Sequence, residues 1–343
     1  MKTQILNSKG EAIVLNAQEQ NIARHNQQIM NSLGYEIDMT TLTAISKRVV
    51  EQKFFTVRPS EFLPVRVGEG AWSSDILTYR DFSIAGDFET GIQNTGSSNA
   101  RLADADAGVD SITVPVINWA KQINYSLIDL NMAARSGNWD LITSKERARK
   151  KNWDLGIQKI AFLGSTDNAN VKGLLTQADV TANTTLITEK LSTMTATEYT
   201  GFVAGVVAAY RGNSNFTAMP THFIIPEDDY NGLVAPYSES FPNISKLSYL
   251  LEAFKTITQN PNFEVRPLAY ANKAQNAEVS GLNKNRYTLL NYDEDSLRMD
   301  IPVDYTNTVQ NSINGFTYQN VGYGQFTGVK AYRPKEVLYF DYA

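Results

Sequence analysis

The residue types that most often carry out catalysis or bind metals are scarce in this chain. There is no cysteine, and the two histidines are His25 and His222. We therefore expect neither a Cys/His nucleophilic pair nor a conventional structural zinc site. Any metal would have to bind through oxygen ligands alone. His222 precedes Phe223, Ile224 and Ile225, a pattern typical of a histidine in a buried strand.

Short motifs for cofactor binding are equally weak. The stretch GYGQFTG (322–328) has the wrong glycine spacing for a dinucleotide fingerprint. The run DADAGVD (104–110) resembles a calcium loop, but Pro115 occupies the position that requires a bidentate glutamate. Acidic residues 227–229 suit the start of a helix, where the helix dipole favours negative charge. We expect no catalytic residues, no metal, no cofactor and no enzymatic activity.

The chemistry that stands out is charge of opposite sign on two segments. Residues 66–112 contain three basic and eight acidic residues, a net charge of -5. Residues 139–163 contain six basic and three acidic residues, a net charge of +3. Five of the basic residues lie within seven successive positions, a segment that we call the basic spine: Lys145, Arg147, Arg149, Lys150 and Lys151.

On a helix these five side chains would point in almost every direction, so no single surface could bury them. Arg149 lies within the apolar stripe, where its stem can pack while its guanidinium reaches a carboxylate or the edge. A solvated charged helix explains the pattern as well as a partner does.

Length and composition indicate a globular chain of two or three domains. It has 343 residues, of which 42% are hydrophobic and 20% charged. The net charge of -5 argues against a free nucleic-acid-binding protein. No apolar run has the length of a signal peptide or a membrane span, so we expect the chain to fold in the cytoplasm without membrane contact.

A long helix over about 139–163 must carry the basic spine. Asn138 can cap it, Gly164 can stop it, and Ile142, Trp153, Gly156, Ile157 and Ile160 share one stripe. Before it, residues 1–53 form an arm with two modest helices, and residues 66–112 read as short strands and turns too poor in apolar residues for a core.

The remaining segments differ in their order of helix and strand. After a strand at 112–125, residues 126–135 turn helical. Residues 176–296 alternate helix and strand, which predicts an α/β domain. The last part of the chain reads as strands at 286–292, 296–303, 315–323, 326–332 and 336–342.

This order of parts resembles the major capsid protein of tailed bacteriophages, whose fold is shared with encapsulins and the herpesvirus shell floor. The resemblance rests on segments 67–91, 104–127, 151–164 and 171–176. It implies an α+β fold with four parts: an N-terminal arm (1–53), an extended β-hairpin loop (66–112), a peripheral domain (54–65, 113–175 and 297–343) with the spine helix, and an axial α/β domain (176–296).

The resemblance also implies a function. The chain would self-assemble as hexamers and pentamers into an icosahedral shell that encloses double-stranded DNA, in a virion assembled in the cytoplasm of a bacterial host. Portal, scaffolding and decoration proteins are the implied partners, and contact with the packaged DNA would be weak and non-specific. The extended loop would lie on a neighbouring subunit through Glu69, Trp72, Tyr79, Arg80, Asp81, Phe82, Phe88 and Glu89.

Several alternatives remain open. The basic spine would meet either the acidic loop of a neighbour or the packaged DNA. An encapsulin-like compartment is a second kind of shell, and an α+β enzyme or carbohydrate-binding module could use the exposed aromatic residues as a platform. Some members of the fold join subunits through a lysine in the extended loop. No lysine lies between Lys53 and Lys121, so we do not expect that cross-link.

Overall fold

The structure is a computed structural model that describes residues 5–6, 12–13, 55–84, 106–135, 140–279 and 282–342. Two compact units account for the chain. Unit 1 comprises Met1–Phe55, Lys121–Lys150 and Thr308–Val321, and unit 2 comprises Thr56–Ala120, Lys151–Asn307 and Gly322–Ala343. Strands β1 (Ile5–Leu6) and β2 (Ala12–Ile13) pair antiparallel. The two helices expected in the arm lie outside the described residues.

Unit 1 has a small core of its own. It contains α2 (Leu127–Arg135), β14 (Asn311–Ser312), the start of α3 (Leu141–Leu163) and parts of β5 (Asp106–Ser126) and β15 (Thr317–Thr327). Tyr125, Ala133 and Leu141 form the buried cluster. The rings of Tyr125 and Tyr318 stack with centroids 5.8 Å apart. Aromatic stacking thus joins β5 to β15 within this unit.

Helix α3 is the predicted spine, and its ends follow local signals. Asp140 caps its start, because the Thr143 amide donates to the Asp140 carboxylate over 3.1 Å. Gly164 ends it with a φ of 80°, the left-handed conformation expected of a terminating glycine. The predicted range of 139–163 is therefore confirmed to within two residues at its start. Asn138, the expected cap, lies outside the described residues.

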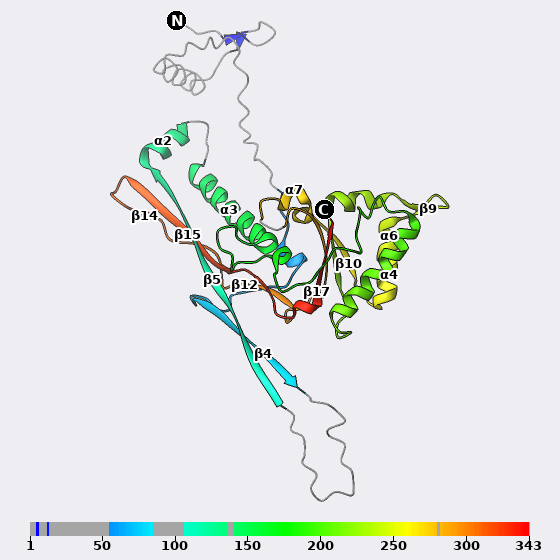
Figure 1. Cartoon of the computed structure of the whole chain (residues 1–343). Helices are drawn as coiled ribbons and strands as arrows, with labels where there is room; N and C mark the ends of the chain where they lie inside the picture. Colours follow the sequence, from blue (N-terminus) through cyan, green and yellow to red (C-terminus); the bar gives the residue numbers. More distant parts are fainter. Residues whose placement is uncertain are drawn as a thin grey trace, which may run out of the picture. The chain divides into compact units, whose positions relative to one another are not determined.

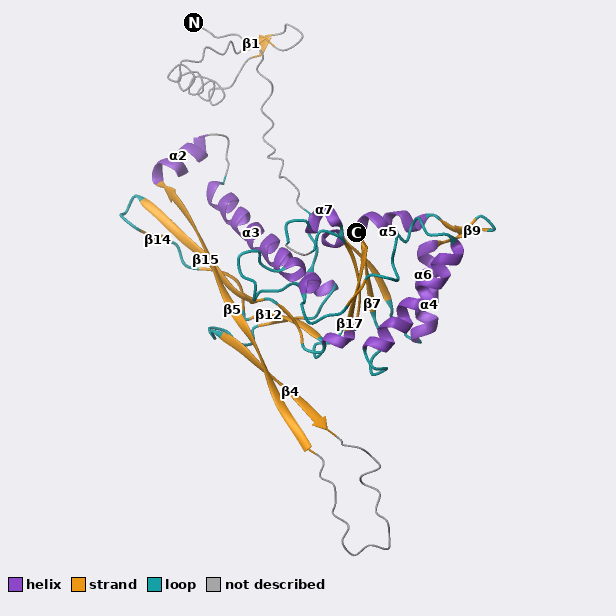
Figure 2. Cartoon of the chain, in the orientation of Figure 1, coloured by secondary structure: helices purple, strands orange, loops and turns teal. Residues whose placement is uncertain are grey.

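Unit 2 is built on a five-stranded sheet in the order β10 (Glu264–Leu268), β7 (His222–Pro226), β11 (Asn285–Leu290), β17 (Val337–Tyr342) and β6 (Ala182–Asn183). Strands β7 and β10 are parallel, whereas β11 runs antiparallel to both β7 and β17. Figure 2 shows the sheet beside helices α4 (Ala196–Asn213) and α6 (Lys246–Thr258).

Both faces of this sheet are buried, which explains the continuous apolar run of β7. Phe223 and Ile225 pack in the cluster that includes α4 and α6. Ile224 belongs to a second cluster, which includes Trp153 and Ile157 of α3. Because successive strand residues point to opposite faces, a strand covered on both sides needs apolar residues at every position.

The predicted alternation of helices and strands over residues 176–296 is present. Local sequence signals also predicted where helices α4 and α5 begin. The Thr195 amide donates to the Glu198 carboxylate over 2.9 Å, completing the expected capping box of α4. Helix α5 (Glu227–Tyr230) follows Pro226 as expected. Its buried Asp229 accepts hydrogen bonds from the Leu191 and Ser192 amides and from the Tyr287 hydroxyl. That carboxylate therefore holds neighbouring segments together.

The late strands divide between several sheets. Strand β12 (Leu297–Ile301) lies between β16 (Val329–Ala331) and β3 (Val65–Val67). A further sheet has the order β13 (Val303–Asn307), β15, β5 and β4 (Asp75–Ile84). The other short elements are β8 (Pro236–Ser238), β9 (Phe241–Ser245), α7 (Lys273–Asn276) and 3-10 turns at 59–61, 174–176, 231–234, 269–271 and 334–336. Strand β17 lies in the sheet of β7, so residues 337–342 pair with the segment predicted to be axial.

The glycines of GYGQFTG have a packing role. A Cβ on Gly324 would collide with the Trp153 indole, and one on Gly328 would press against the Lys172 backbone. The stretch lies mostly in β15, where close approach requires the missing side chains.

Candidate inter-subunit site: the extended hairpin and its anchor

Strands β4 and β5 form a long antiparallel hairpin within unit 2 (Figure 1). Their register runs without a break from the pair Asp75 and Pro115 to the pair Ile84 and Asp106. Ten paired residues extend about 33 Å at about 3.3 Å per residue. Within the loop predicted over 66–112, residues 75–84 and 106–112 thus belong to a hairpin, whereas Arg66 and Val67 pair with β12.

Large apolar side chains on this hairpin and in the turn before it face solvent. Trp72 and Tyr79 are each 70% exposed, and Val109 is 68% exposed. Leu77, on β4, is also exposed. A two-stranded ribbon is marginal in water by itself, and exposed apolar groups add nothing to its stability in an isolated subunit. Their arrangement suits a surface that another molecule covers.

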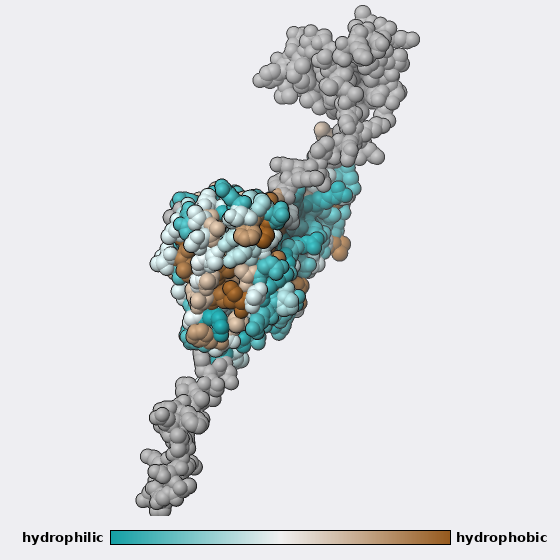
Figure 3. All heavy atoms as spheres, turned by 90° about the vertical axis from the view of Figure 1, so that its right-hand side faces the viewer, coloured by the Kyte–Doolittle hydropathy of each residue, from teal (hydrophilic) through white to brown (hydrophobic). Residues whose placement is uncertain are grey.

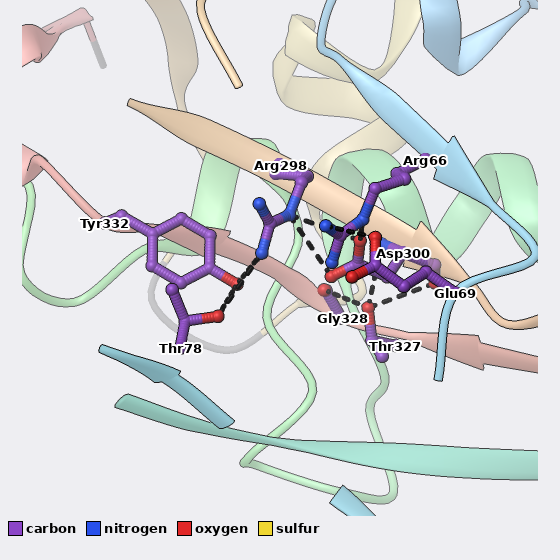
Figure 4. A network of polar contacts seen from close by, with 8 residues as sticks. All are labelled: Arg66, Glu69, Thr78, Arg298, Asp300, Thr327, Gly328 and Tyr332. Carbon is purple, nitrogen blue, oxygen red and sulfur yellow. Dashed lines mark hydrogen bonds and ion pairs between the residues drawn. The ribbon is translucent and has the colours of Figure 1, made fainter. Parts of the chain in front are cut away.

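The root of the hairpin is held by a buried carboxylate, shown in Figure 4. The Asp300 side chain is 3% exposed and accepts from two guanidinium groups, that of Arg66 over 2.9 Å and that of Arg298 over 3.4 Å. Thr327 secures the Asp300 backbone, accepting from its amide over 3.0 Å and donating to its carbonyl over 3.1 Å. Arg66 comes from β3 and Arg298 and Asp300 from β12, so this cluster, the root network, joins adjacent strands.

The root network extends to β4 through Tyr332. Arg298 donates to the Tyr332 hydroxyl over 3.1 Å and to the Thr78 hydroxyl over 3.3 Å. Burial alone would lower the pKa of Arg298, but Tyr332 and Asp300 outweigh it and raise that pKa above its usual value. The Arg298 guanidinium is therefore a fixed positive charge beside Thr78 on β4.

Further polar contacts fix the direction in which β4 leaves. Arg80 donates to the Tyr332 carbonyl over 3.3 Å and pairs with Asp110 across the hairpin over 3.1 Å. Trp72 has a φ of 65°, which is unusual for a bulky residue, and its amide donates to the Gln325 side chain over 2.8 Å. Glu69 pairs with Arg66 over 2.5 Å. The start of the hairpin is thus held by contacts within the chain, whereas the Tyr79 side chain on β4 is exposed.

The structure places the predicted loop residues in three groups. Glu69, Trp72 and Arg80 have contacts within the chain at the hairpin root, and Tyr79 is exposed on β4. Asp81 and Phe82 lie on β4 without a described side chain position. Phe88 and Glu89 lie outside the described residues. Their contact with a neighbour remains a prediction.

The basic spine is divided between internal and exposed side chains. Arg149 is buried and donates to the Asn320 carbonyl over 2.8 Å and to the Asn320 side chain over 2.9 Å. The Lys145 ammonium donates to the Asn124 carbonyl over 2.7 Å. Arg147 and Lys150 are exposed and Lys151 is half-buried. Arg149 therefore holds segments of unit 1 together. Its partners are backbone carbonyls and the Asn320 side-chain amide, whereas a carboxylate or the edge of the buried stripe was expected.

The root network was not predicted from the sequence. Its members are Arg66, Arg298, Asp300, Thr327, Tyr332 and Thr78. The one available signal was the RMD triplet at 298–300, which puts two opposite charges into a predicted strand. Charges in a buried strand require partners, but the triplet does not name them.

Neither a metal site nor a membrane span is found in the described part of the chain. No group of three or more His, Asp or Glu residues there could hold a metal ion. Among the described helices, none combines the length and hydrophobicity needed to cross a bilayer.

Comparison with solved structures defines the class of fold. The capsid of Myoviridae phage XM1 superposes with a TM-score of 0.73 at 16% identity, covering 90% of this chain and 100% of that one. A chain from Mycobacterium phage Bobi gives a TM-score of 0.57 at 9% identity, covering 90% and 97%. The capsid of the native GTA particle gives 0.53 at 12% identity, covering 86% and 95%. The fold is that of tailed-phage capsid proteins.

The family follows from the sequence. The model of the major capsid protein family matches residues 91–343, more than half of the chain. The chain therefore belongs to the major capsid protein family, and the predicted resemblance and α+β capsid fold are confirmed. No curated protein matches it.

Proposed function

We propose that this capsid protein self-assembles as hexamers and pentamers into an icosahedral shell that encloses double-stranded phage DNA. The exposed hairpin is the observation that carries this proposal. Trp72, Tyr79 and Val109 would lose their solvent contact on a neighbouring subunit, and the root network fixes the start of the strand that carries Tyr79. Hydrophobic burial would then drive association, and the fixed root would set its geometry.

Charge would set which surface the hairpin covers. Segment 66–112 carries a net charge of -5, and segment 139–163 carries +3. Within α3, Arg147 and Lys150 present basic side chains to solvent. The acidic hairpin of one subunit would therefore lie across the basic spine of the next, a pairing that favours correct register more than raw affinity.

The first experiment is expression of the chain alone, followed by size-exclusion chromatography and negative-stain electron microscopy. Hollow icosahedral particles, or isolated five- and six-fold rings, are the expected products. A monomer or dimer, combined with the absence of this protein from the shell of purified phage, would contradict the proposal.

The Lys150→Glu, Lys151→Glu double variant tests the charge pairing. We expect at least a tenfold lower yield of particles, because the acidic hairpin would meet acidic side chains on its neighbour. The matched control reverses Lys190 and Lys273, which form no ion pair with any residue that the structure describes. Empty shells should already fail to form. Normal empty shells with a defect confined to DNA-filled particles, relieved by added salt, would instead assign the spine to DNA.

A further inference from the structure

A second exposed apolar surface lies on the β8–β9 hairpin of unit 2. Strands β8 and β9 are antiparallel and close through Glu239 and Ser240. Phe241 is 58% exposed directly after this turn, and Ile244 on β9 and Val234 before β8 are also exposed. We call this surface the hairpin end of the α4 and α6 layer.

The hairpin end is fixed to the beginning of both helices. The Tyr237 hydroxyl lies 2.6 Å from the Thr200 hydroxyl of α4, and the rings of Tyr237 and Tyr249 stack with centroids 4.3 Å apart. The Tyr199 hydroxyl donates to the Lys246 carbonyl over 3.0 Å, which places the first turns of α4 and α6 side by side.

A third exposed surface follows the last turn of α4. Phe216 is 71% exposed, and Met219 close by is also exposed. Asn215 and Phe216 both have positive φ, 51° and 62°. Consecutive left-handed residues are costly, and an exposed phenylalanine recovers none of that cost by burial within its own chain. We call this surface the turn end.

The two surfaces lie at opposite ends of one layer. Helix α4 has 18 residues and is therefore about 27 Å long, with Tyr237 at its first turns and Phe216 after its last. Figure 3 shows the side of the molecule that carries α4 and α6, with hydrophobic residues in separate patches among hydrophilic ones. A continuous flat apolar face could contact another copy in many orientations. Two different patches at opposite ends of α4 would instead fix the direction in which copies contact one another.

Each end also carries a charged side chain that forms no ion pair among the described residues. The Arg211 guanidinium lies over the Phe216 ring, with its carbon 5.2 Å from the ring centroid. Neither Arg211 nor Glu239 forms an ion pair with any side chain in the described ranges. At the turn end an aromatic ring thus lies against a positive charge, and at the hairpin end Glu239 lies two residues before Phe241.

We propose that the hairpin end of one copy docks on the turn end of the next, so that Phe241 and Glu239 meet Phe216 and Arg211. Two different surfaces at opposite ends make a head-to-tail contact, and such a contact closes into a ring when its rotation divides a full turn. The inference rests on the proposed shell function and adds a contact that the extended hairpin does not make.

Cross-linking between copies tests this directly, because the chain contains no cysteine. The Asn215→Cys, Ser240→Cys double variant is assembled, treated with a short bis-maleimide and run on a denaturing gel. Head-to-tail contact should give a ladder that ends at five or six copies. Each single variant should give no ladder. A dimer from either single variant would mean that like ends meet, which overturns the proposal.

The same experiment separates this contact from shell formation. Normal particles of the double variant without a ladder would overturn the contact and leave the shell function standing. If the unmodified chain stays monomeric and is absent from the shell of purified phage, and the double variant gives no cross-linked species at any concentration, both proposals fail.

A charge exchange provides independent support. Arg211→Glu and Glu239→Arg should each reduce particle yield at least fivefold, and the two together should restore it. Lys273→Glu makes the same change in charge at an exposed site on α7 and should leave the yield unchanged. Failure of the double exchange to recover any yield would overturn the proposed pairing. Phe216→Gly should lower the yield while the subunit unfolds at the same temperature or higher, because glycine adopts the left-handed conformation without strain.

Discussion

Asp300 is the residue on which the hairpin anchor depends. Its carboxylate is almost fully buried and balances Arg66 and Arg298. Removing one partner of a buried ion pair leaves an uncompensated charge, which typically destabilises a protein by about 3 kcal/mol. We therefore expect Asp300→Asn to lower the free energy of unfolding by about 3 kcal/mol, measured by urea denaturation of the subunit.

The control for this substitution is Asp179→Asn. Asp179 pairs with Lys330 over 3.0 Å, but its side chain is 61% exposed. Exposed pairs contribute little, so the free energy of unfolding should change by no more than about 0.5 kcal/mol. Equal effects of the two substitutions would show that the root network does not stabilise the subunit.

Asp341 makes the stability of the sheet sensitive to acid. Burial alone would raise the pKa of Asp341, but hydrogen bonds and charge from Arg286 and Lys284 overcome it and lower that pKa. A lowered folded-state pKa contributes stability above the unfolded value of about 3.9, and this stability is lost as pH falls through the folded value. The free energy of unfolding should therefore decrease below about pH 4.

Asp341→Asn tests the assignment of this acid sensitivity. The variant should be less stable at pH 7, and its free energy of unfolding should fall less between pH 5 and pH 3 than that of the unmodified chain, measured by urea denaturation at each pH. Parallel curves for the two proteins would mean that other carboxylates carry the acid sensitivity.

Charge content at the residue scale was predictable, but its pairing was not. The net charges of segments 66–112 and 139–163 follow from counting. The hydrogen bond between Arg66 and Asp300 joins positions 234 residues apart, and no local sequence pattern predicts this pairing. Arg149 shows the same limit, because its place in the apolar stripe predicted a buried stem but not Asn320 as the partner.

Elements with local start and stop signals were predicted well. Helix α3 ends at the left-handed Gly164, and helix α4 begins after its N-cap Thr195, both as expected. Stop and cap residues of this kind act within one turn of helix. Strand β15 was predicted as parts of two strands, 315–323 and 326–332. It runs unbroken through Thr317–Thr327, because Gly324 makes room for the Trp153 indole and does not mark a turn there.

A substitution of Gly156 tests whether the face of α3 around it is packed within the subunit. The sequence placed it in the buried stripe, but it is exposed, and a Cβ there would meet no atom within 4 Å. Glycine inside a helix costs about 1 kcal/mol relative to alanine. Gly156→Ala should therefore raise the free energy of unfolding of the subunit by about 0.5–1 kcal/mol, measured by urea denaturation.

Gly164→Ala is the matched opposite. Gly164 has a φ of 80°, and a Cβ there would collide with the Val171 carbonyl. This substitution should destabilise the subunit, because both the backbone conformation and the close approach require glycine. A loss of stability in Gly156→Ala of similar size would mean that the face around Gly156 is packed within the subunit.

For the whole molecule, the fold separates the parts that stabilise a subunit from the parts that extend beyond it. The core clusters of the described residues draw on no position between Arg66 and Thr113. The hairpin is nevertheless fixed at its root by charged side chains from β3 and β12. A rigid root with an exposed, acidic extension is an arrangement in which folding precedes association.

That separation predicts the behaviour of a shortened chain. Replacing residues 82–108 by Asn-Gly keeps Asp81 opposite Val109, as in the observed register, and closes the hairpin with a favoured two-residue turn. The root network is retained, so the free energy of unfolding should stay within about 1 kcal/mol of the unmodified value. Particles should be absent by electron microscopy, because the deletion removes the extended part of the loop, including Phe82, Phe88 and Glu89, which are predicted to contact a neighbour. Particles of normal size from this chain would show that other contacts, such as the one between Phe216 and Phe241, suffice to hold the shell together.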